Sequence, residues 1–455
     1  SIPATLRAAT ESLRGSTMLR EAMGNDVIDH YVRCAEWEQE DFDRVVTDYE
    51  VKRGFEQAQD TAMSTPIQCI SPIDGSVYVQ RTTLSLEAAR EAVARAKNAQ
   101  PDWAALPLSE RVQRVRDGIA RLGDMNDDIV EKLAWQMGRP VRYGGEFGGV
   151  DERAGMMADL AEEGLAPIEI ENSASFHRYI RREPHGAVLV VAPWNYPYMT
   201  AVNTVVPALI AGNAVFLKHA SQTPLVGEHM AEAFHAAGVP REIFQNVFLS
   251  HDTTSALIAE KAFGFVNFTG SVNGGQAIER AAAGTFTGVG LELGGKDPGY
   301  VMDDADLDAA VETLIDGAMF NAGQCCCGIE RIYVAENLFD AFVEKAVAIV
   351  SGYRLGNPLD RDTTLGPMAH VRFADHVRKQ TEEAVASGAR ALIDGEAQAL
   401  AGVVIHSPTT CTIELEQPLS YFPGMLAHRM LGIVPEGSQL GPNKKLDMAI
   451  GTGPF

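Results

Sequence analysis

The chain of 455 residues has a deficit of basic side chains. Lysine and arginine together number 38, against 61 aspartates and glutamates, which gives a formal net charge of −23. Nucleic acids and acidic membrane surfaces attract basic proteins, so this balance argues against both as partners. It favours a protein whose ligands are small molecules.

Long apolar runs are also lacking. The apolar stretch GAVLVVAPW at 186–194 is far shorter than the roughly 20 residues that a membrane-spanning helix needs. The N-terminal segment SIPATLRAATESLRGS has no apolar core of the kind that a signal peptide contains. There is no internal repeat and no low-complexity segment, and the length predicts two or three domains.

Cysteine is scarce, and its spacing excludes two classes of site. The six cysteines stand at positions 34, 69, 325, 326, 327 and 411. No CxxC pair or Cys/His set has zinc spacing, so we predict no metal and no disulfide framework. A reducing, cytoplasmic compartment is the matching expectation. The consecutive Cys325, Cys326 and Cys327 are either a reactive thiol with two companions or three small hydrophobes in a buried segment.

Two kinds of periodicity divide the chain. Residues 26–50 and the stretches SLEAAREAVARAKNA and LSERVQRVRDGIARLGD show apolar residues at helical spacing. From residue 186 apolar strands alternate with helices such as 225–237 and 273–283. This alternation predicts an α/β fold with a parallel sheet.

The stretch FTGSVNGGQ fits a nucleotide site. It predicts a strand at 265–268, then Gly270 and Ser271, then a helix whose N-terminal amides can face a pyrophosphate. It is not a GxGxxG fingerprint, and a tight turn before a surface helix is the alternative. Lys218 ends another predicted strand, where it suits ribose hydroxyls or a phosphate, although a lone lysine is more often a solvated charge.

Two further side chains have both a chemical and a structural interpretation. Glu292, flanked by Leu291 and Leu293, either faces outward or lies in a site that raises its pKa towards the range of a general base. Asn195 lies on a turn between Pro193 and Pro197, where it is either a turn residue or a donor to a developing oxyanion.

Taken in order, these motifs resemble the aldehyde dehydrogenase superfamily over residues 65–405. The matching stretches are PWNYP at 193–197, KHASQTP at 218–224, FTGS at 268–271, LELGGK at 291–296 and FNAGQCCCGIER at 320–331, with weaker matches at RLGNPLD 354–360 and LGPM 365–368. The resemblance implies a Rossmann-type NAD(P)-binding domain at 58–288, containing a bridging hairpin at 175–186, and an incomplete catalytic domain at 289–405. It also implies a dimer or tetramer, with a monomer as the alternative.

The resemblance assigns the chemistry residue by residue. Cys326, the second residue after Gly-Gln, is the nucleophile that forms a thiohemiacetal and then a thioester; Cys325 and Cys327 are neighbours that pack. Asn195 and the backbone N–H of Cys326 hold the oxyanion, and Glu292 activates the hydrolytic water. The cofactor-binding residues that it implies are Pro193, Trp194, Lys218, Ser221, Gly270, Ser271, Gly274 and Gly275.

Two departures from the family pattern bear on function. Members that prefer NAD often carry Glu three residues after the lysine, where this chain has Ser221, so we expect NADP to be accepted alongside NAD. Residues 406–455 lack the acidic-Phe-Gly-Pro motif of the family and form a divergent tail. A catalytically impaired remnant that only binds nucleotide or partners is therefore an alternative to an active enzyme.

Residues 1–57 resemble the C-terminal helical end of the glutamine synthetase family, nearest its polyamine-glutamylating branch. The metal- and ATP-binding carboxylates of that family are absent, so no activity is carried over, and an inert helical appendage is the alternative. A fusion of this segment with an aldehyde dehydrogenase suggests an aminoaldehyde such as γ-glutamyl-γ-aminobutyraldehyde as substrate. Glu292 argues against a third option, an acylating enzyme that uses coenzyme A.

Overall fold

The computed structural model describes residues 66–393 and, nearer the N-terminus, positions 10, 11, 13–18, 25, 28, 29, 32, 33 and 36. The chain divides into two compact units, Ser1–Thr65 and Pro66–Phe455. In the first unit the described positions from 25 to 36 are helical, and Ile28 and Val32 are buried. They agree with the predicted helix at 26–50 as far as they reach; the rest of that prediction and the tail at 406–455 lie outside the described residues.

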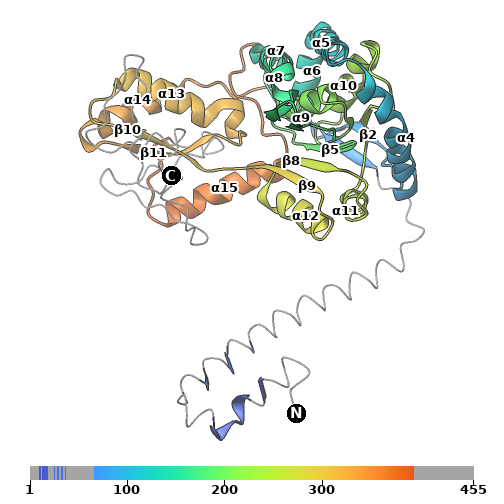
Figure 1. The fold of residues 1–455 in the computed structure, drawn as a ribbon. Helices are drawn as coiled ribbons and strands as arrows, with labels where there is room; N and C mark the ends of the chain where they lie inside the picture. The colour runs from blue at the N-terminus through green and yellow to red at the C-terminus, as the bar shows by residue number, and fades with distance from the viewer. Residues whose placement is uncertain are drawn as a thin grey trace. The chain divides into compact units, whose positions relative to one another are not determined.

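The second unit is built from alternating strands and helices (Figure 1). Its strands are β1 Ile67–Ile70, β2 Val77–Arg81, β3 Ile168–Asn172, β4 His177–Ile180, β5 Ala187–Ala192, β6 Ala214–His219, β7 Phe244–Asn246, β8 Phe265–Gly270, β9 Gly288–Leu293, β10 Asp297–Val301 and β11 Ile329–Val334. Its α-helices are α4 Leu86–Ala105, α5 Leu108–Asp124, α6 Asn126–Met137, α7 Phe147–Asp159, α8 Ala161–Leu165, α9 Pro197–Ile210, α10 Leu225–Ala236, α11 His251–Ala259, α12 Val272–Ala282, α13 Leu307–Met319, α14 Phe339–Ser351 and α15 Val371–Ala386. Short 3₁₀ turns lie at Val141–Tyr143, Phe320–Gly323 and Glu336–Leu338.

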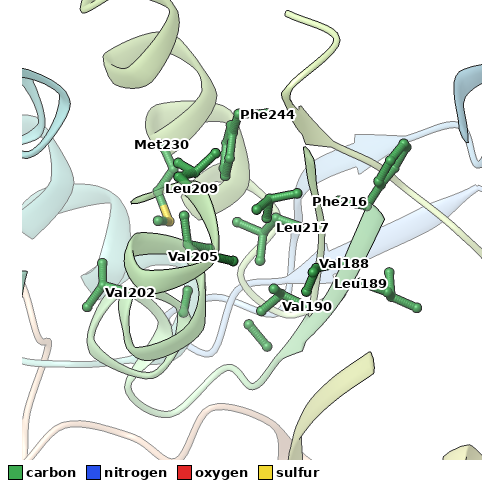
Figure 2. Close-up of a cluster of buried hydrophobic side chains, with 14 of the residues drawn as sticks. Val188, Leu189, Val190, Val202, Val205, Leu209, Phe216, Leu217, Met230 and Phe244 are labelled. Carbon is green, nitrogen blue, oxygen red and sulfur yellow. The ribbon is translucent and has the colours of Figure 1, made fainter. Parts of the chain in front are cut away.

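Five strands form the main sheet, in the order β7-β6-β5-β8-β9, and every neighbouring pair is parallel. β5 and β6 are apolar along their length because helices cover both faces of the sheet. Figure 2 shows this alternation: Val190 and Leu217 point toward α9, whereas Leu189 and Phe216 point to the opposite face. The predicted α/β fold with a parallel sheet is confirmed.

The strand order creates a switch point at the carboxyl edge of the sheet. From β5 the chain runs to β6 and β7 on one side, and it then returns to place β8 and β9 on the other side. Loops that leave the strands on either side of such a point diverge, and the crevice between them is where open α/β sheets bind ligands. Here the loops after β5 and β8 flank that crevice.

Local sequence accounts for the helices around the sheet. Ser85 caps α4, as its position predicts, by accepting a hydrogen bond from the backbone N–H of Ala88 at 3.2 Å. Trp103 of the same helix is buried and donates from Nε1 to the carbonyl of Leu209 at 2.9 Å. This bond ties α4 to the end of α9, so the helices are fixed to each other as well as to the sheet.

A second apolar core lies beyond the sheet. It is formed by β10 and β11, which pair in parallel, together with α13 and α14, and Phe342 is fully buried in it. The predicted boundary between a cofactor domain and a catalytic domain, at 288/289, falls at the start of β9, which belongs to the main sheet. The domain limits stay a prediction. The main sheet ends with β9 before residues 294–296, and the second core begins with β10 after them.

The hairpin expected at 175–186 forms earlier in the chain. β3 at Ile168–Asn172 pairs in antiparallel fashion with β4 at His177–Ile180, and residues 181–186 belong to no strand. The reason is local: the alternating stretch IEIEN supplies the first strand, and Ser173 closes the turn by accepting from the backbone N–H of Phe176 at 3.2 Å. Within the described residues, no helix is long and apolar enough to cross a membrane.

Candidate functional site

Two loops at the switch point carry the predicted cofactor residues. Pro193 and Trp194 directly follow β5, and both are half-buried. The Trp194 ring stacks on Phe373 of α15, with ring centroids 5.0 Å apart. This contact fixes the loop that carries Pro193 against α15.

After β8 the chain turns tightly into α12. Gly270 ends the strand, and Ser271 caps the helix by accepting from the backbone N–H of Gly274 at 3.2 Å. A Cβ atom on Gly274 would lie 2.4 Å from Cζ of Phe268, and one on Gly275 would lie 2.7 Å from Cδ2 of Leu293. Only glycine lets the first turn of α12 approach the sheet this closely, and that leaves the N-terminal amides of α12 at the crevice.

Lys218 is the penultimate residue of β6 and is buried. Burial lowers the pKa of its ammonium group, because the charged form loses solvation. Ser221 lies three residues further on and is exposed. Lys218 also depresses the pKa of His251, at the start of α11, although burial of the imidazole has the larger effect. A buried cation beside an exposed hydroxyl is a suitable setting for an anionic group of a ligand.

The three consecutive cysteines form a turn, which we call the cysteine turn (Cys325–Cys327). The backbone of Asn321, Ala322 and Gly323 before it is left-handed, with φ of 53°, 57° and 73°. Gly328 N–H then donates to the carbonyl of Cys325 at 3.3 Å and closes a β-turn. Left-handed backbone is costly at a non-glycine residue, and less so at asparagine than at alanine.

The three thiols differ in exposure. Cys325 is half-buried, whereas Cys326 and Cys327 are exposed, so the alternative of three small hydrophobes in a buried segment does not describe Cys326 and Cys327. Burial raises the pKa of Cys325 to about 11, and it also raises the pKa of Cys326, with the thiol of Cys327 adding to the effect. Cys326 is therefore accessible but mainly protonated at neutral pH in the free protein.

Asn195 lies beside the cysteine turn. Its backbone carbonyl accepts from Nδ2 of Asn321 at 3.1 Å, so the two loops are bonded directly. Its side-chain Oδ1 accepts from the backbone N–H of Tyr196 at 3.0 Å. Nδ2 of Asn195 has no partner among the described residues, so the donor end of this amide is free to bind an oxyanion.

A buried ion pair that the sequence did not reveal supports this arrangement. Arg139 pairs with Glu146 at 2.7 Å, and their side chains are 8% and 3% exposed. Arg139 also donates to the carbonyl of Asn195 at 2.6 Å, and Glu146 accepts from the backbone N–H groups of Tyr198 and Met199 at the start of α9. The pair thus holds the carbonyl of Asn195 and the start of α9 that follows it.

Glu292 lies near the end of β9, opposite Thr269 of β8, and its side chain is exposed. The glycines that follow allow a close approach to the cysteine turn: a Cβ on Gly295 would lie 3.3 Å from the carbonyl of Cys326. The strand that carries Glu292 therefore ends beside Cys326. Of the two interpretations of Glu292, the outward-facing one describes the side chain in the free protein.

The predicted residues thus gather at one edge of the sheet. Those assigned to the cofactor follow β5, β6 and β8, and the cysteine turn contacts both the Asn195 loop and the Gly294-Gly295 segment. Sequence reasoning missed Arg139, Glu146 and Asn321. A buried arginine and glutamate look like surface charges in a sequence, and only Asn321 lies inside a recognised motif.

Comparison with known proteins decides the family. The model of the "Aldehyde dehydrogenase family" matches residues 58–414. The chain belongs to the aldehyde dehydrogenase family. A second model, "Glutamine synthetase, catalytic domain", matches residues 1–54. Both predicted resemblances are confirmed, with limits a few residues from those expected.

Several aldehyde dehydrogenases of known name are similar to this chain. "Succinate semialdehyde dehydrogenase [NAD(P)+] Sad" of Escherichia coli is 32% identical over 66% of this chain and 65% of its own length. "Succinate-semialdehyde dehydrogenase [NADP(+)] 1" of Mycobacterium tuberculosis is 32% identical over 71% of this chain and 72% of its own length. The chain therefore spans about two thirds of these relatives. The predicted cofactor, NAD or NADP, agrees with both names.

Solved aldehyde dehydrogenase structures have the same fold. The structure titled "Structural insights into cofactor and substrate selection by Gox0499" matches with a TM-score of 0.69 at 32% identity, covering 72% of each chain. That of a gamma-glutamyl-gamma-aminobutyraldehyde dehydrogenase from Burkholderia cenocepacia matches with a TM-score of 0.68 at 29% identity, covering 72% of this chain and 68% of that one. The aldehyde-dehydrogenase fold expected from the motifs is confirmed.

Proposed function

We propose that the chain oxidises an aldehyde to a carboxylic acid with NAD or NADP. The observation that carries this proposal is the exposed thiol of Cys326 in a turn that is hydrogen-bonded to the Asn195 loop at the switch point of a parallel sheet. A nucleophile beside an oxyanion donor and a dinucleotide crevice is the combination that this reaction needs.

Each residue has a defined part in the proposed reaction. The sulfur of Cys326 attacks the aldehyde carbon and forms a thiohemiacetal. The free Nδ2 of Asn195 and the backbone N–H of Cys326 donate hydrogen bonds to its oxyanion. A nicotinamide bound in the crevice supplies the hydride acceptor, and a thioester to Cys326 is left. The carboxylate of Glu292 then takes a proton from water as the water oxygen attacks the thioester carbon. The C–S bond breaks, the acid leaves, and the sulfur of Cys326 is released as a thiolate.

The crevice suits a dinucleotide. The glycines at 270, 274 and 275 let the start of α12 pack against Phe268 and Leu293, where a Cβ would clash, and the helix N-terminus favours a pyrophosphate. Lys218 and Ser221 would hold the adenosine ribose, with Pro193 and Trp194 lining the neighbouring loop. Because Ser221 brings no carboxylate against a 2′-phosphate, we infer that NADP is accepted as well as NAD.

We propose a substrate with a carboxylate distant from its aldehyde. Succinate semialdehyde, named for the similar E. coli and mycobacterial proteins, and γ-glutamyl-γ-aminobutyraldehyde, named for the Burkholderia structure, share this feature. The match of residues 1–54 to glutamine synthetase favours the second, because a γ-glutamyl ligase would supply the γ-glutamylated amine from which an amine-oxidising enzyme forms that aldehyde. The kinetic comparison below separates the two.

The test is an assay of NAD and NADP reduction by the purified chain. Butanal serves as the control for succinate semialdehyde, because it has the same carbon chain without the carboxylate, and γ-glutamyl-γ-aminobutyraldehyde is the third substrate. We expect kcat/KM at least about tenfold above that of butanal for one of the two carboxylated aldehydes. Equal values for all three would refute the substrate class. No reduction with any aldehyde by the folded chain would refute the activity and favour a chain that only binds nucleotide.

Acyl transfer to coenzyme A is the competing fate of the thioester. Glu292 beside the Gly294-Gly295 segment favours water as the acceptor. The same assay distinguishes the two, because an acylating enzyme needs coenzyme A for sustained turnover, whereas we expect sustained turnover in its absence.

We further propose that the β3–β4 hairpin mediates assembly into a dimer or tetramer. Ile168, Ile170, Phe176, Tyr179 and Ile180 are all exposed on it, and a run of apolar side chains on a hairpin favours pairing with a second copy. Light scattering should give a mass of two or four chains. Substitution of Ile170 and Tyr179 by lysine should shift it to one chain, and a wild-type monomer would refute the proposal.

A further inference from the structure

The cysteine turn brings three thiols together. In an extended segment neighbouring side chains point to opposite sides, so three consecutive cysteines would be kept apart. The β-turn closed by the Gly328 N–H changes this. The sulfur atoms of Cys325, Cys326 and Cys327 all lie within 4.8 Å of one another, and those of Cys325 and Cys327 are 3.4 Å apart.

These separations match the ligand sphere of a thiophilic metal ion. Zinc–sulfur bonds of about 2.3 Å in tetrahedral geometry place two sulfur ligands about 3.8 Å apart. That distance lies inside the range that the three thiols span without any change of backbone. Three protein ligands leave a fourth position open, and soft thiolate ligands select zinc and similar ions over magnesium or calcium.

The surroundings favour a cation. Cys326 and Cys327 are exposed, so an ion reaches them from solvent. Asp297 lies near the turn: the position of a Cβ on Gly295 is 2.9 Å from its Oδ1 and 3.3 Å from the carbonyl of Cys326. The net charge of −23 adds a general attraction for cations.

A buried hydroxyl also faces the turn. The hydroxyl of Tyr196 is buried, and the thiol of Cys325 lies within hydrogen-bonding reach of it. The ring lies between Phe320, on which it stacks at 5.8 Å, and the Arg139 guanidinium, which lies 5.0 Å from its centroid. Tyr196 is therefore a neighbour of the Cys325 thiol, and the thiols of Cys326 and Cys327 stay open to solvent.

We propose that Cys325, Cys326 and Cys327 together bind one thiophilic divalent cation of the zinc class. Three metal–sulfur bonds form as three S–H protons leave to solvent, and no electrons are transferred. Binding itself does not depend on the proposed function. Its consequence does: a sulfur of Cys326 held by the metal cannot attack an aldehyde, so the cation is a reversible inhibitor that a chelator removes.

The experiment titrates the reduced, full-length chain with Zn²⁺ in competition with a chromophoric chelator. Ultraviolet absorption of the Cd²⁺ complex, which reports metal–thiolate bonds, gives the number of sulfur ligands. The test variant is Cys325→Ser combined with Cys327→Ser. The matched control removes two cysteines outside the turn, Cys34→Ser combined with Cys411→Ser.

We expect one zinc ion per wild-type and per control chain, and three thiolate ligands to Cd²⁺. The test variant should bind at least about 100-fold more weakly, because loss of outer partners alone weakens metal sites by 10- to 100-fold and here two ligands are lost. Equal affinity of the test variant and the wild type would overturn the proposal. So would less than one bound ion per wild-type chain.

Activity is scored as the ratio of rates with and without Zn²⁺ for each variant, so that differences in basal rate cancel. We expect strong inhibition of the wild type and the control and little inhibition of the test variant. Zinc binding by a chain that oxidises no aldehyde when metal-free would refute the proposed function and leave the metal site standing. Bound zinc that leaves the wild-type rate unchanged would overturn the inhibitory role.

Discussion

The carboxyl edge of the main sheet and the cysteine turn meet in one site but are built differently. At the sheet edge, functional positions follow buried parallel strands, and glycines at 274 and 275 fit against Phe268 and Leu293. The cysteine turn is exposed, and left-handed residues at Asn321 and Ala322 precede it. The sheet edge is fixed by regular hydrogen bonding, whereas the turn depends on a few side-chain contacts from Asn321 and Arg139. Substitutions at the turn should therefore affect chemistry most, and substitutions at the sheet edge should affect the choice of ligand.

The largest effect is expected at the nucleophile. Cys326→Ser should lower kcat/KM by at least about 10⁴-fold, because loss of an enzyme's nucleophile removes nearly all of its chemical rate enhancement. Cys325→Ser, next to it and more buried, should cost less than about tenfold. The measurement is cofactor reduction at 340 nm in both variants. A loss with Cys325→Ser as large as that with Cys326→Ser would assign the nucleophile to Cys325.

The next effect separates the two halves of the reaction. Glu292→Gln should leave hydride transfer in a first turnover and then stall at the thioester, with steady turnover reduced roughly 10²- to 10⁴-fold. Rapid mixing resolves the burst from the steady phase. Glu279→Gln, also exposed but on α12, is the control and should show no burst. Unimpaired steady turnover of Glu292→Gln would mean that another group activates water.

Loss of the buried Arg139–Glu146 pair should lower the free energy of unfolding. Arg139→Met leaves Glu146 buried without its cation, and breaking one partner of a buried pair costs about 3–5 kcal/mol. Because Arg139 also holds the carbonyl of Asn195, kcat should fall more than KM rises. Urea unfolding and steady kinetics measure the two effects. The double variant Arg139→Met with Glu146→Gln should recover part of the stability but not kcat. Recovery of both would mean that Arg139 serves only to neutralise the buried Glu146 and does not position Asn195.

The same comparison explains what sequence could predict. Buried strands are short apolar runs that are visible in the sequence, so the parallel sheet and the residues at the strand ends were predicted. The Arg139–Glu146 pair was not, because nothing in a sequence distinguishes a buried charge from a surface one. Nor was the turn geometry, since three consecutive cysteines fit a buried segment as well as an exposed turn. The hairpin lies earlier in the chain than expected, because the alternating stretch IEIEN supplies its first strand.

The reactivity of the turn should depend on pH. Burial and the neighbouring thiol of Cys327 raise the pKa of Cys326 above its ordinary value, so its thiolate fraction is small at pH 7. Only the thiolate is alkylated, so the rate with iodoacetamide should rise about tenfold for each pH unit between pH 7 and pH 8. Mass spectrometry assigns the labelled cysteine. A rate that is flat over this range would mean that the pKa of Cys326 is lowered in the protein.

The smallest expected effect lies at the sheet edge, where Ser221→Glu should change cofactor choice without touching the chemistry. Ser221 is exposed and follows the buried Lys218, so a carboxylate at position 221 would face a 2′-phosphate directly. Two like charges near 4 Å repel by about 1–4 kcal/mol in partly solvated surroundings, which corresponds to at least about a tenfold rise in KM for NADP. KM for NAD should stay the same or fall, because a carboxylate accepts hydrogen bonds from ribose hydroxyls.

Ser221→Gln has the same reach without the charge, and it should leave the NADP/NAD ratio within about threefold. If Ser221→Glu and Ser221→Gln lowered NADP use equally, size rather than charge would set the cofactor choice, and the inference from Ser221 to NADP would fail.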